Sequence, residues 1–332
     1  MASKDWTLEE IGELTRGYQA ACILIAAAEW DLFSQMSGPP FTAAQAAAKL
    51  GADLRALTIL LDALVALRLL NKDAQHYDIP ASLADILSSG GSQSILAMTQ
   101  HQAACLRRWA GLGEVVKTGR PAPRQAGLRG AQAEYASFVE AMDNVGRSMA
   151  AGVVAALQPL KFRHLLDVGG ASGTYTIAFL QANPTAQATL FDLPQVLPQA
   201  AQRLKKAGLI DRVKLVAGDF YLDRLPQGAD LAWVSAIIHQ NSRQQNRNLF
   251  ALVFAALVSG GRILVRDFLM ESTRTAPAGG ALFAINMLVA TEKGGTYTFD
   301  EVRDDLAAAG FTDIAAPRRD DTMYSVMAGR KP

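Results

Sequence analysis

A glycine-rich segment in the C-terminal half of the chain follows a short apolar run. The run HLLDV leads into GGASG, where Gly169, Gly170 and Gly173 let the backbone approach a ligand closely. The helix expected next offers free backbone N–H groups. The dinucleotide fingerprint G-x-G-x-x-G does not fit, because Ala171 and Thr174 occupy its later glycine positions. The pattern D-x-G-x-G-x-G fits in form, with alanine at the middle glycine, and it is typical of sites for S-adenosylmethionine (SAM).

Polar and aromatic residues also follow the next apolar runs along the chain. Asp192 ends the second run, where a carboxylate can accept hydrogen bonds from both ribose hydroxyls of an adenosine. Asp219 and Phe220 end the third run and offer an acceptor for the adenine amino group and a ring for its face. Leu193 and Ser235, at the ends of the second and fourth runs, are included in the predicted cofactor site. Any one of these residues has an ordinary structural role, but together they predict a nucleoside site.

One of the four histidines lies where a catalytic base would be useful. His239 comes just after the fourth apolar run, in IIHQNS, whereas His164 opens the first run and therefore lies at the opposite edge of the predicted sheet. His76 and His101 are most simply exposed. Because an imidazole can accept a proton near neutral pH, His239 is the candidate general base for a substrate hydroxyl.

Composition excludes several classes of protein. The 332 residues include 32 Lys and Arg against 31 Asp and Glu, so the net charge of +1 gives no electrostatic footprint for bulk nucleic-acid binding. Two cysteines cannot build a disulfide scaffold or a four-thiolate metal site, and we expect no metal. The start lacks a signal-peptide pattern, and the apolar runs are too short to span a membrane. We therefore expect a cytoplasmic protein without membrane or nucleic-acid partners.

Hydrophobic periodicity divides the chain near residue 160. Before it, nearly every segment has helical spacing, and two helices around a Gly-Ala-Asp turn followed by a hairpin at 69–80 predict a winged helix-turn-helix. After it, strands alternate with helices, which predicts a parallel sheet with helices on both faces. The predicted division is 1–90, a winged-helix domain; 91–158, a helical linker with pocket-lining helices; and 159–332, the catalytic domain. Residues 269–298 interrupt the alternation and are expected to cover the ligand edge of the sheet.

The motifs LLDVGGASG, FDLPQV, GDFY and IIH, in this order and spacing, resemble the plant and bacterial SAM-dependent small-molecule O-methyltransferases. The resemblance covers nearly the whole chain, because that family also has a helical, winged-helix dimerisation domain before a Rossmann-like class I methyltransferase sheet. It implies a homodimer, SAM as cofactor with S-adenosylhomocysteine (SAH) as product, and a small aromatic or polyketide-like hydroxyl substrate.

The resemblance also implies roles for individual residues. Gly169, Asp192, Asp219 and Phe220 are expected to bind SAM, and His239 is expected to remove the substrate proton. The long helix FVEAMDNVGRSMAAGVV resembles the family helix whose Phe and Met line the substrate pocket. The pocket is then expected to be formed by five residues: Phe138, Met142, Phe283, Asn286 and Met287.

The chain departs from the family around the base. Asp-Trp usually follows the base, whereas Gln240 and Asn241 follow here, and Ser235 replaces a common lysine. The family has two acids beside its base, and alignment on local motifs places Ala284 and Thr296 at those positions. The base is therefore expected to lack its usual carboxylate partners.

One acidic residue is a candidate replacement for the missing partners. Asp267, at the end of the fifth strand, can orient the base, or it can be an ordinary strand-end acid.

Two alternatives to methyl transfer remain open from the sequence. A family member can keep SAM for chemistry other than methylation. The missing acids favour this interpretation, whereas the presence of His239 argues against it. A DNA-binding regulator would use the winged helix, but its candidate recognition helix has only two arginines and a broad apolar surface, which suits a partner subunit better than phosphate.

Overall fold

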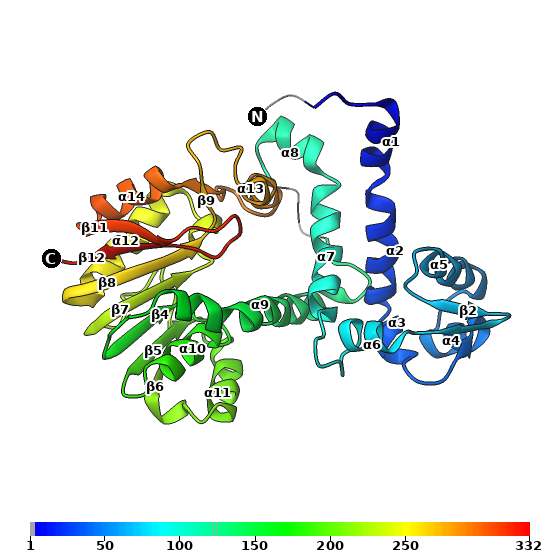
Figure 1. Ribbon diagram of the computed structural model, residues 1–332, viewed down its shortest axis with the longest axis horizontal. Helices are drawn as coiled ribbons and strands as arrows, with labels where there is room; N and C mark the ends of the chain where they lie inside the picture. Colours follow the sequence, from blue (N-terminus) through cyan, green and yellow to red (C-terminus); the bar gives the residue numbers. More distant parts are fainter. Residues whose placement is uncertain (1–3, 122, 124) are drawn as a thin grey trace. The chain divides into compact units, whose positions relative to one another are not determined.

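The computed structural model of the chain describes residues 4–121, 123 and 125–332, and for residues 143, 145 and 148 it describes the backbone only (Figure 1). Two compact units are present: residues 1–107 with 124–144, and residues 108–123 with 145–332. The segment 91–158, predicted as a linker, is thus shared between the two units, and the three-part division stays a prediction. Within the described ranges, no helix is both long and apolar enough to cross a membrane.

The N-terminal unit is a bundle of helices that carries a small three-stranded sheet. Its helices begin at strong caps: Thr7 and Thr42 form capping boxes with Glu10 and Gln45, and Asp53 caps the helix after the turn. The strands pair in the order β1-β3-β2, which is the predicted hairpin with one added strand. The elements are α1 (Leu8–Arg16), α2 (Tyr18–Glu29), α3 (Leu32–Gln35), β1 (Phe41–Thr42), α4 (Ala43–Leu50), α5 (Leu54–Ala66), β2 (Asn71–Asp73), β3 (His76–Asp78), α6 (Ala81–Leu87), most of α7 (Leu96–Trp109) and the first half of α9 (Gly130–Ala156).

The C-terminal unit is built on a seven-stranded sheet of order β11-β12-β8-β7-β4-β5-β6 (Figure 1). The five strands from β8 to β6 are parallel, as predicted, but β12 runs antiparallel to both β8 and β11, so the sheet is mixed. The strands are β4 (His164–Val168), β5 (Gln187–Asp192), β6 (Val213–Ala217), β7 (Ala229–Ser235), β8 (Leu257–Asp267), β11 (Thr312–Arg318) and β12 (Ser325–Arg330).

Helices cover both faces of this sheet, which creates two hydrophobic cores. Successive residues of a strand point to opposite faces, so that Leu165 packs in one core and Leu166 in the other. One core also holds α10 (Thr174–Ala182), α11 (Leu197–Lys206) and the end of α9, and the other holds α12 (Arg243–Ala256) and α14 (Phe299–Ala308). Short elements complete the unit: α8 (Leu112–Thr118), η1 (Ile210–Arg212) and η2 (Ile238–Gln240).

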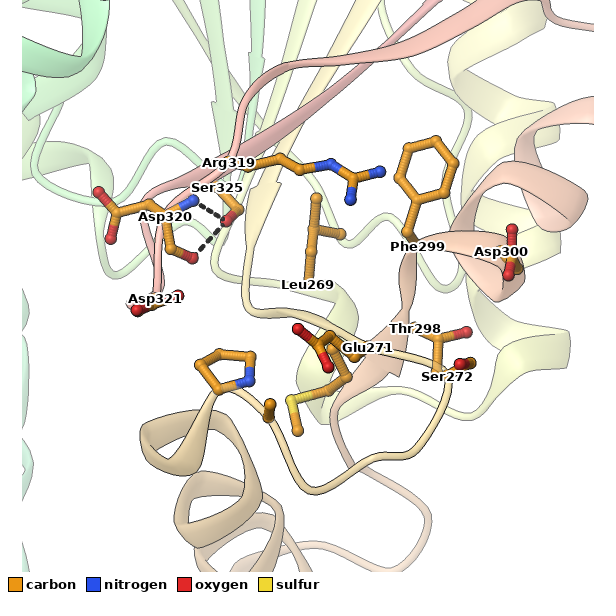
Figure 2. Close-up of a pocket in the computed structure, with 13 residues that line it drawn as sticks. Leu269, Glu271, Ser272, Thr298, Phe299, Asp300, Arg319, Asp320, Asp321 and Ser325 are labelled. Carbon is orange, nitrogen blue, oxygen red and sulfur yellow. Dashed lines mark hydrogen bonds between the residues drawn. The ribbon is translucent and has the colours of Figure 1, made fainter. Parts of the chain in front are cut away.

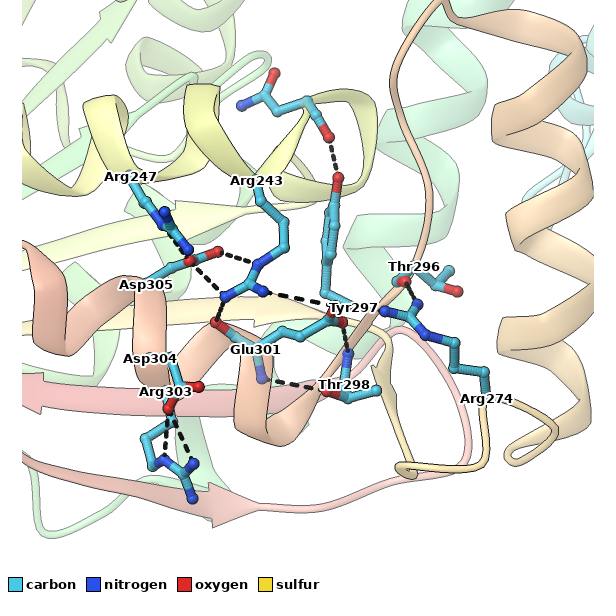
Figure 3. Close-up of polar contacts among 11 residues, drawn as sticks. Arg243, Arg247, Arg274, Thr296, Tyr297, Thr298, Glu301, Arg303, Asp304 and Asp305 are labelled. Atoms are coloured by element: carbon cyan, nitrogen blue, oxygen red, sulfur yellow. Dashed lines mark hydrogen bonds and ion pairs between the residues drawn. The ribbon is translucent and has the colours of Figure 1, made fainter. Parts of the chain in front are cut away.

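The segment 269–298 folds into β9 (Leu269–Met270), α13 (Ala278–Ala290) and β10 (Tyr297–Thr298). A charged cluster around the buried Asp305 anchors its end to the helices beside it (Figure 3). Arg243 and Arg247 of α12 contact the buried Asp305 of α14 at 2.7 and 2.6 Å, and Arg274 pairs with Glu301. Because two guanidinium groups of α12 share the Asp305 carboxylate of α14, these two helices are held in a fixed position relative to each other.

Candidate active site

The glycine segment turns sharply after β4, at the place where the strand order reverses between β4 and β7. Gly169 and Gly173 have φ of 66° and 76°, which side chains rarely adopt, and Gly173 is the N-cap of α10. A Cβ on Gly169 would lie 2.7 Å from Cδ1 of Ile237, and one on Gly170 would lie 2.6 Å from Cγ of Leu190. Glycine is therefore required here by packing as well as by any ligand.

The Asp192 carboxylate is held against the glycine segment by two backbone donors. The N–H of Ala171 donates to Oδ2 and the N–H of Leu193 donates to Oδ1, both at 2.7 Å. Burial raises the pKa of Asp192, and these two hydrogen bonds partly offset that effect by favouring the carboxylate. Each oxygen keeps a lone pair, so the group can accept two further hydrogen bonds.

Asp167 lies behind the same segment and is almost completely buried. Its Oδ2 accepts a hydrogen bond of 2.5 Å from the Thr176 hydroxyl. Burial raises the pKa of Asp167 to about 7; the Thr176 hydrogen bond lowers it and the charge of Asp192 raises it. Sequence reasoning treated Asp167 only as part of the motif, although its environment makes it the most perturbed carboxyl of the site.

The residues after β6 form a tight turn that faces the glycine segment. The N–H of Asp219 donates to Asp223 at 2.8 Å, and the N–H of Tyr221 donates to Oδ1 of Asp219 at 2.8 Å. The Phe220 ring packs against the Tyr221 ring with centroids 4.6 Å apart, and its edge lies 3.6 Å from the position of a Cβ on Gly169. The ends of β4, β5 and β6 thus converge, as the strand-end residues led us to expect.

Ser235 at the end of β7 has its hydroxyl engaged within the protein. The Oγ accepts a hydrogen bond of 2.6 Å from Nε of Arg266, whose guanidinium lies over the rings of Tyr175 and Tyr324. Sequence reasoning missed Arg266, although a charged residue inside the apolar strand ILVRDF is a visible signal of a specific partner. A cofactor contact for Ser235 stays a prediction.

His239 lies on η2 and is bonded to a buried carboxylate. Its Nδ1 is 3.0 and 2.9 Å from the two oxygens of Asp267, at the end of β8. The Asp267 side chain is 1% exposed and the His239 side chain 13% exposed. Asp267, named above as the candidate replacement for the family's acids, thus contacts the ring, because parallel pairing of β7 with β8 brings the end of β8 beside η2. With Nδ1–H donating to the carboxylate, Nε2 is left as a proton acceptor.

One of the three predicted pocket residues of α13 contacts this pair. The Phe283 ring meets the His239 ring edge to face, with centroids 4.9 Å apart. Oδ1 of Asn286 accepts a hydrogen bond of 3.1 Å from Nε1 of Trp109, and Met287 is buried. Helix α13 therefore packs against His239 through Phe283.

The residues predicted at the family's acidic positions carry no charge, and one of them has a structural contact. The backbone oxygen of Thr296 accepts a hydrogen bond of 3.1 Å from Arg274, and Ala284 lies on α13 (Figure 3).

Phe138 and Met142 lie on α9 within the N-terminal unit. Their side chains are 41% and 40% exposed, and the Phe138 ring contacts the His101 ring at 5.1 Å. Their place in a substrate pocket stays a prediction.

A hollow of about 960 Å³ lies elsewhere in the C-terminal unit, between the β9–β10 pair and the turn after β11 (Figure 2). Arg319, Phe299 and Glu271 line it, with Arg319 4.5 Å from the Phe299 ring. None of the predicted site residues lines it. The converging strand ends, not this hollow, thus form the candidate site.

The family model for the O-methyltransferase domain matches residues 109–312, and that for the O-methyltransferase dimerisation domain matches residues 13–89. The chain is 33% identical to the tetracenomycin polyketide synthesis 8-O-methyl transferase TcmO of Streptomyces glaucescens, over 97% of this chain and 96% of that protein. It is 32% identical to the 3-hydroxy-5-methyl-1-naphthoate 3-O-methyltransferase of Streptomyces sahachiroi, over 92% and 90%.

Solved structures agree with these matches. The human N-acetylserotonin methyltransferase in complex with SAM superposes with a TM-score of 0.83 at 25% identity, covering 100% of this chain and 99% of that one. The predicted Rossmann-like class I methyltransferase sheet and the N-terminal dimerisation domain are thereby confirmed.

The buried Asp167 predicts a characteristic pH dependence of stability. Its pKa is about 7 in the folded protein against about 3.9 in an unfolded chain. Because the folded state holds this proton more tightly, the group lowers stability progressively as pH rises from about 4 to about 7. We expect the unfolding free energy of Asp167→Asn, relative to that of the unsubstituted protein, to be about 2–3 kcal/mol higher at pH 8 than at pH 5. Urea unfolding at both pH values measures this difference.

The matched control is Asp211→Asn, since Asp211 is exposed on η1. Its unfolding free energy should follow that of the unsubstituted protein at both pH values. A pH-independent difference for Asp167→Asn would show that the carboxyl is not the titrating group.

Proposed function

Since this chain belongs to the family of SAM-dependent O-methyltransferases, we propose that it methylates a hydroxyl of a small aromatic or polyketide-like metabolite, with His239 as general base. The observation that carries the proposal is the hydrogen-bonded pair of His239 and Asp267 beside the converging strand ends. The two bacterial relatives support the substrate class, since their names specify a polyketide and a naphthoate as acceptors.

The residues at the strand ends suit SAM. The Asp192 oxygens, each with a free lone pair, are the acceptors for the ribose hydroxyls, and Leu193 lies beside them at 37% exposure. Asp219 is the acceptor for the adenine amino group, and the Phe220 ring packs against the face of the adenine.

Gly169, Gly170 and Gly173 keep side chains away from the centre of this site, where the remainder of SAM is expected to lie. When bound, SAM supplies a methyl group on a positively charged sulfur that an oxygen nucleophile can attack.

The protein contributes proton transfer and orientation. His239 holds its Nδ1–H on Asp267, so Nε2 can take the proton of the acceptor hydroxyl. Asp267 then stabilises the positive charge on the imidazolium, and its burial strengthens this interaction. Phe268 N–H donates to Asp267 at 2.9 Å and keeps the carboxylate in place.

Helix α13 supplies a wall for the acceptor. Phe283 packs on the base and presents an apolar ring to a flat substrate, and Asn286 and Met287 follow it one helical turn later. For Phe138 and Met142 of α9, contact with the acceptor is proposed on the family resemblance alone.

The N-terminal unit is proposed to form a homodimer. Helix α1 has no buried residue, and a stripe of its apolar side chains faces outward: Leu8 is 96% exposed, Leu14 66% and Ile11 44%. Such a stripe is unfavourable in a monomer, and obligate dimers bury about 2,000 Å² or more. The match to the dimerisation domain supports this assembly.

The cofactor site is tested by replacing the ribose acceptor. Asp192→Ala is expected to weaken SAM binding by roughly 1.5–3 kcal/mol, as for loss of hydrogen bonds to a charged group. Isothermal titration calorimetry measures this directly. Asp211→Ala, on the exposed η1 turn, is the control and should leave the affinity unchanged; equal affinities for all three proteins would remove Asp192 from the site.

The base is tested on one accepted substrate. His239→Ala is expected to lower kcat by roughly 10²–10⁴-fold with SAM affinity nearly unchanged, because only proton transfer is lost. Asp267→Asn should lower kcat in the same direction, since an amide can neither orient the ring in the same tautomer nor stabilise its charge. His76→Ala, on the exposed wing strand β3, is the matched control.

Three outcomes of this experiment differ in meaning. Loss in both variants supports the pair, and loss in His239→Ala alone would mean an unsupported base. No loss in either would show that proximity, rather than base catalysis, accounts for the rate. In the same assay Phe283→Ala should raise the acceptor KM if α13 forms the wall.

The dimer is tested by light scattering at micromolar concentration. We expect twice the chain mass, and Leu14→Glu should raise the dimer dissociation constant at least about tenfold, because it places a charge in an apolar interface. Leu222→Glu is the control, since Leu222 is 85% exposed in the C-terminal unit. A monomer before any substitution contradicts the proposal.

A further inference from the structure

A chain of hydrogen bonds runs from the turn after β6 to the backbone beside the base. The Tyr221 hydroxyl donates to Oδ1 of Asn241, Nδ2 of Asn241 donates to Oδ1 of Asn246 at 3.0 Å, and Nδ2 of Asn246 donates to the carbonyl of Ile238 at 3.1 Å. Asn241 is fully buried and Asn246 is 2% exposed. Ile238 immediately precedes His239, so the last bond reaches the peptide group that carries the base.

The direction of this chain is set by its ends. A backbone carbonyl only accepts, so Asn246 must present its N–H group to Ile238 and its oxygen to Asn241. Asn241 in turn must present its oxygen to Tyr221, and only a donor can complete the chain there. The Tyr221 hydroxyl is that donor, and hydrogen bonds that point the same way strengthen one another.

The peptide groups on both sides of His239 are fixed by such bonds. Besides the bond from Asn246, the Asn241 N–H donates to the Ile238 carbonyl at 3.2 Å, and the Gly295 N–H donates to the His239 carbonyl at 2.8 Å. The Tyr297 hydroxyl donates to the Asn241 carbonyl. The backbone of η2, and with it the ring of His239, therefore depends on where Asn241 lies.

The other end of the chain belongs to the cofactor turn. Tyr221 follows Asp219 and Phe220, bonds to Asp219 through its backbone N–H and packs its ring on Phe220. Tyr221 is half exposed, but its hydroxyl reaches the fully buried Asn241.

We propose that Tyr221 and Asn241 are positioning residues that link the adenosine-binding turn to the catalytic base. Occupation of the turn by the cofactor then holds η2, and His239 on it, in the geometry that accepts a proton. The inference rests on the proposed function, since it takes His239 as the base and Asp219 and Phe220 as cofactor ligands.

A readout without turnover tests the link. The chain has four histidines, so NMR can follow each ring, with His239 assigned from His239→Gln. Addition of SAH is expected to shift and sharpen the His239 signal. In Tyr221→Phe this response should fall by at least about half while SAH affinity by calorimetry stays within about threefold, because one hydrogen bond is lost. An unchanged response in Tyr221→Phe overturns the proposal.

A double-mutant cycle tests it in turnover. Tyr221→Phe should lower kcat by roughly 3–10-fold, but less than about twofold in the His239→Ala background, because the effect acts through the base. Equal factors in both backgrounds would overturn the link. Tyr77→Phe is the matched control, because it too loses one hydroxyl bond, at 2.8 Å to Asp62, in the wing, and kcat should be unchanged.

Asn241→Asp extends the series, since it keeps the acceptor for Tyr221 and loses the donor to Asn246. It should resemble Tyr221→Phe in the NMR experiment, and a response like that of the unsubstituted protein would contradict the proposal. Should this buried variant not fold by circular dichroism, Tyr221→Phe decides the question. If the His239 signal responds to SAH through Tyr221 but no methyl transfer is found, the proposed function alone is rejected. If methyl transfer is found but the response of His239 to SAH is the same in Tyr221→Phe, only the present inference is rejected.

Discussion

Parallel pairing of β4 with β7 at the centre of the sheet is the constraint on which the site depends. Strands β5 and β6 lie on one side of β4, whereas β7 and β8 lie on its other side. The chain segments that follow β4 and β7 must therefore leave the sheet in opposite directions. The carboxyl ends of all five parallel strands lie at the same edge of the sheet. The glycine segment, Asp192 and the turn after β6 lie at the ends of β4, β5 and β6, and η2 and Asp267 lie at the ends of β7 and β8.

Close packing of the site leaves little freedom to its polar groups. The glycines of the β4 turn contact Ile237 and Leu190 so closely that a Cβ would clash, and Asp192 is held by two backbone N–H groups. Groups held in this way need little reorganisation when a ligand binds, which favours both affinity and catalysis. The buried carboxyl of Asp167 lowers the stability of the fold at neutral pH, since its burial disfavours the charged form.

The surroundings of His239 show how a tertiary contact can supply a carboxylate where the local sequence departs from a family pattern. Ala284 and Thr296 carry no carboxylate, yet the imidazole is still oriented, because the strand β8 ends in Asp267 directly beside η2. Gln240 and Asn241 follow His239 where the family usually has Asp-Trp after its base, and Asn241 is incorporated into a buried hydrogen-bond chain instead. The function of the position therefore depends on its contacts, not on the residue type alone.

Local pattern in the sequence was sufficient for the parallel strands of the sheet and for the residues at their ends. Apolar runs stopped by glycine or acid mark strands whatever the fold around them, and strand ends of a parallel sheet meet at one edge. The strand β11 escaped this reasoning, because TDIAAPR is a half-exposed edge strand with a proline and has no apolar run. The antiparallel direction of β12 could not be predicted either, because it depends on how the chain returns to the sheet after β11.

Only the tertiary structure decided which side chains meet. His239 and Asp267 are 28 residues apart, and Tyr221 and Asn241 are 20 apart, so no local periodicity relates them. Arg266 and Ser235 likewise meet only because β7 and β8 are neighbours. Hydrogen bonds need an alignment within a few tenths of an ångström, and that alignment is set by the packing of whole strands and helices. The sequence specifies the participants, and the fold determines their partners.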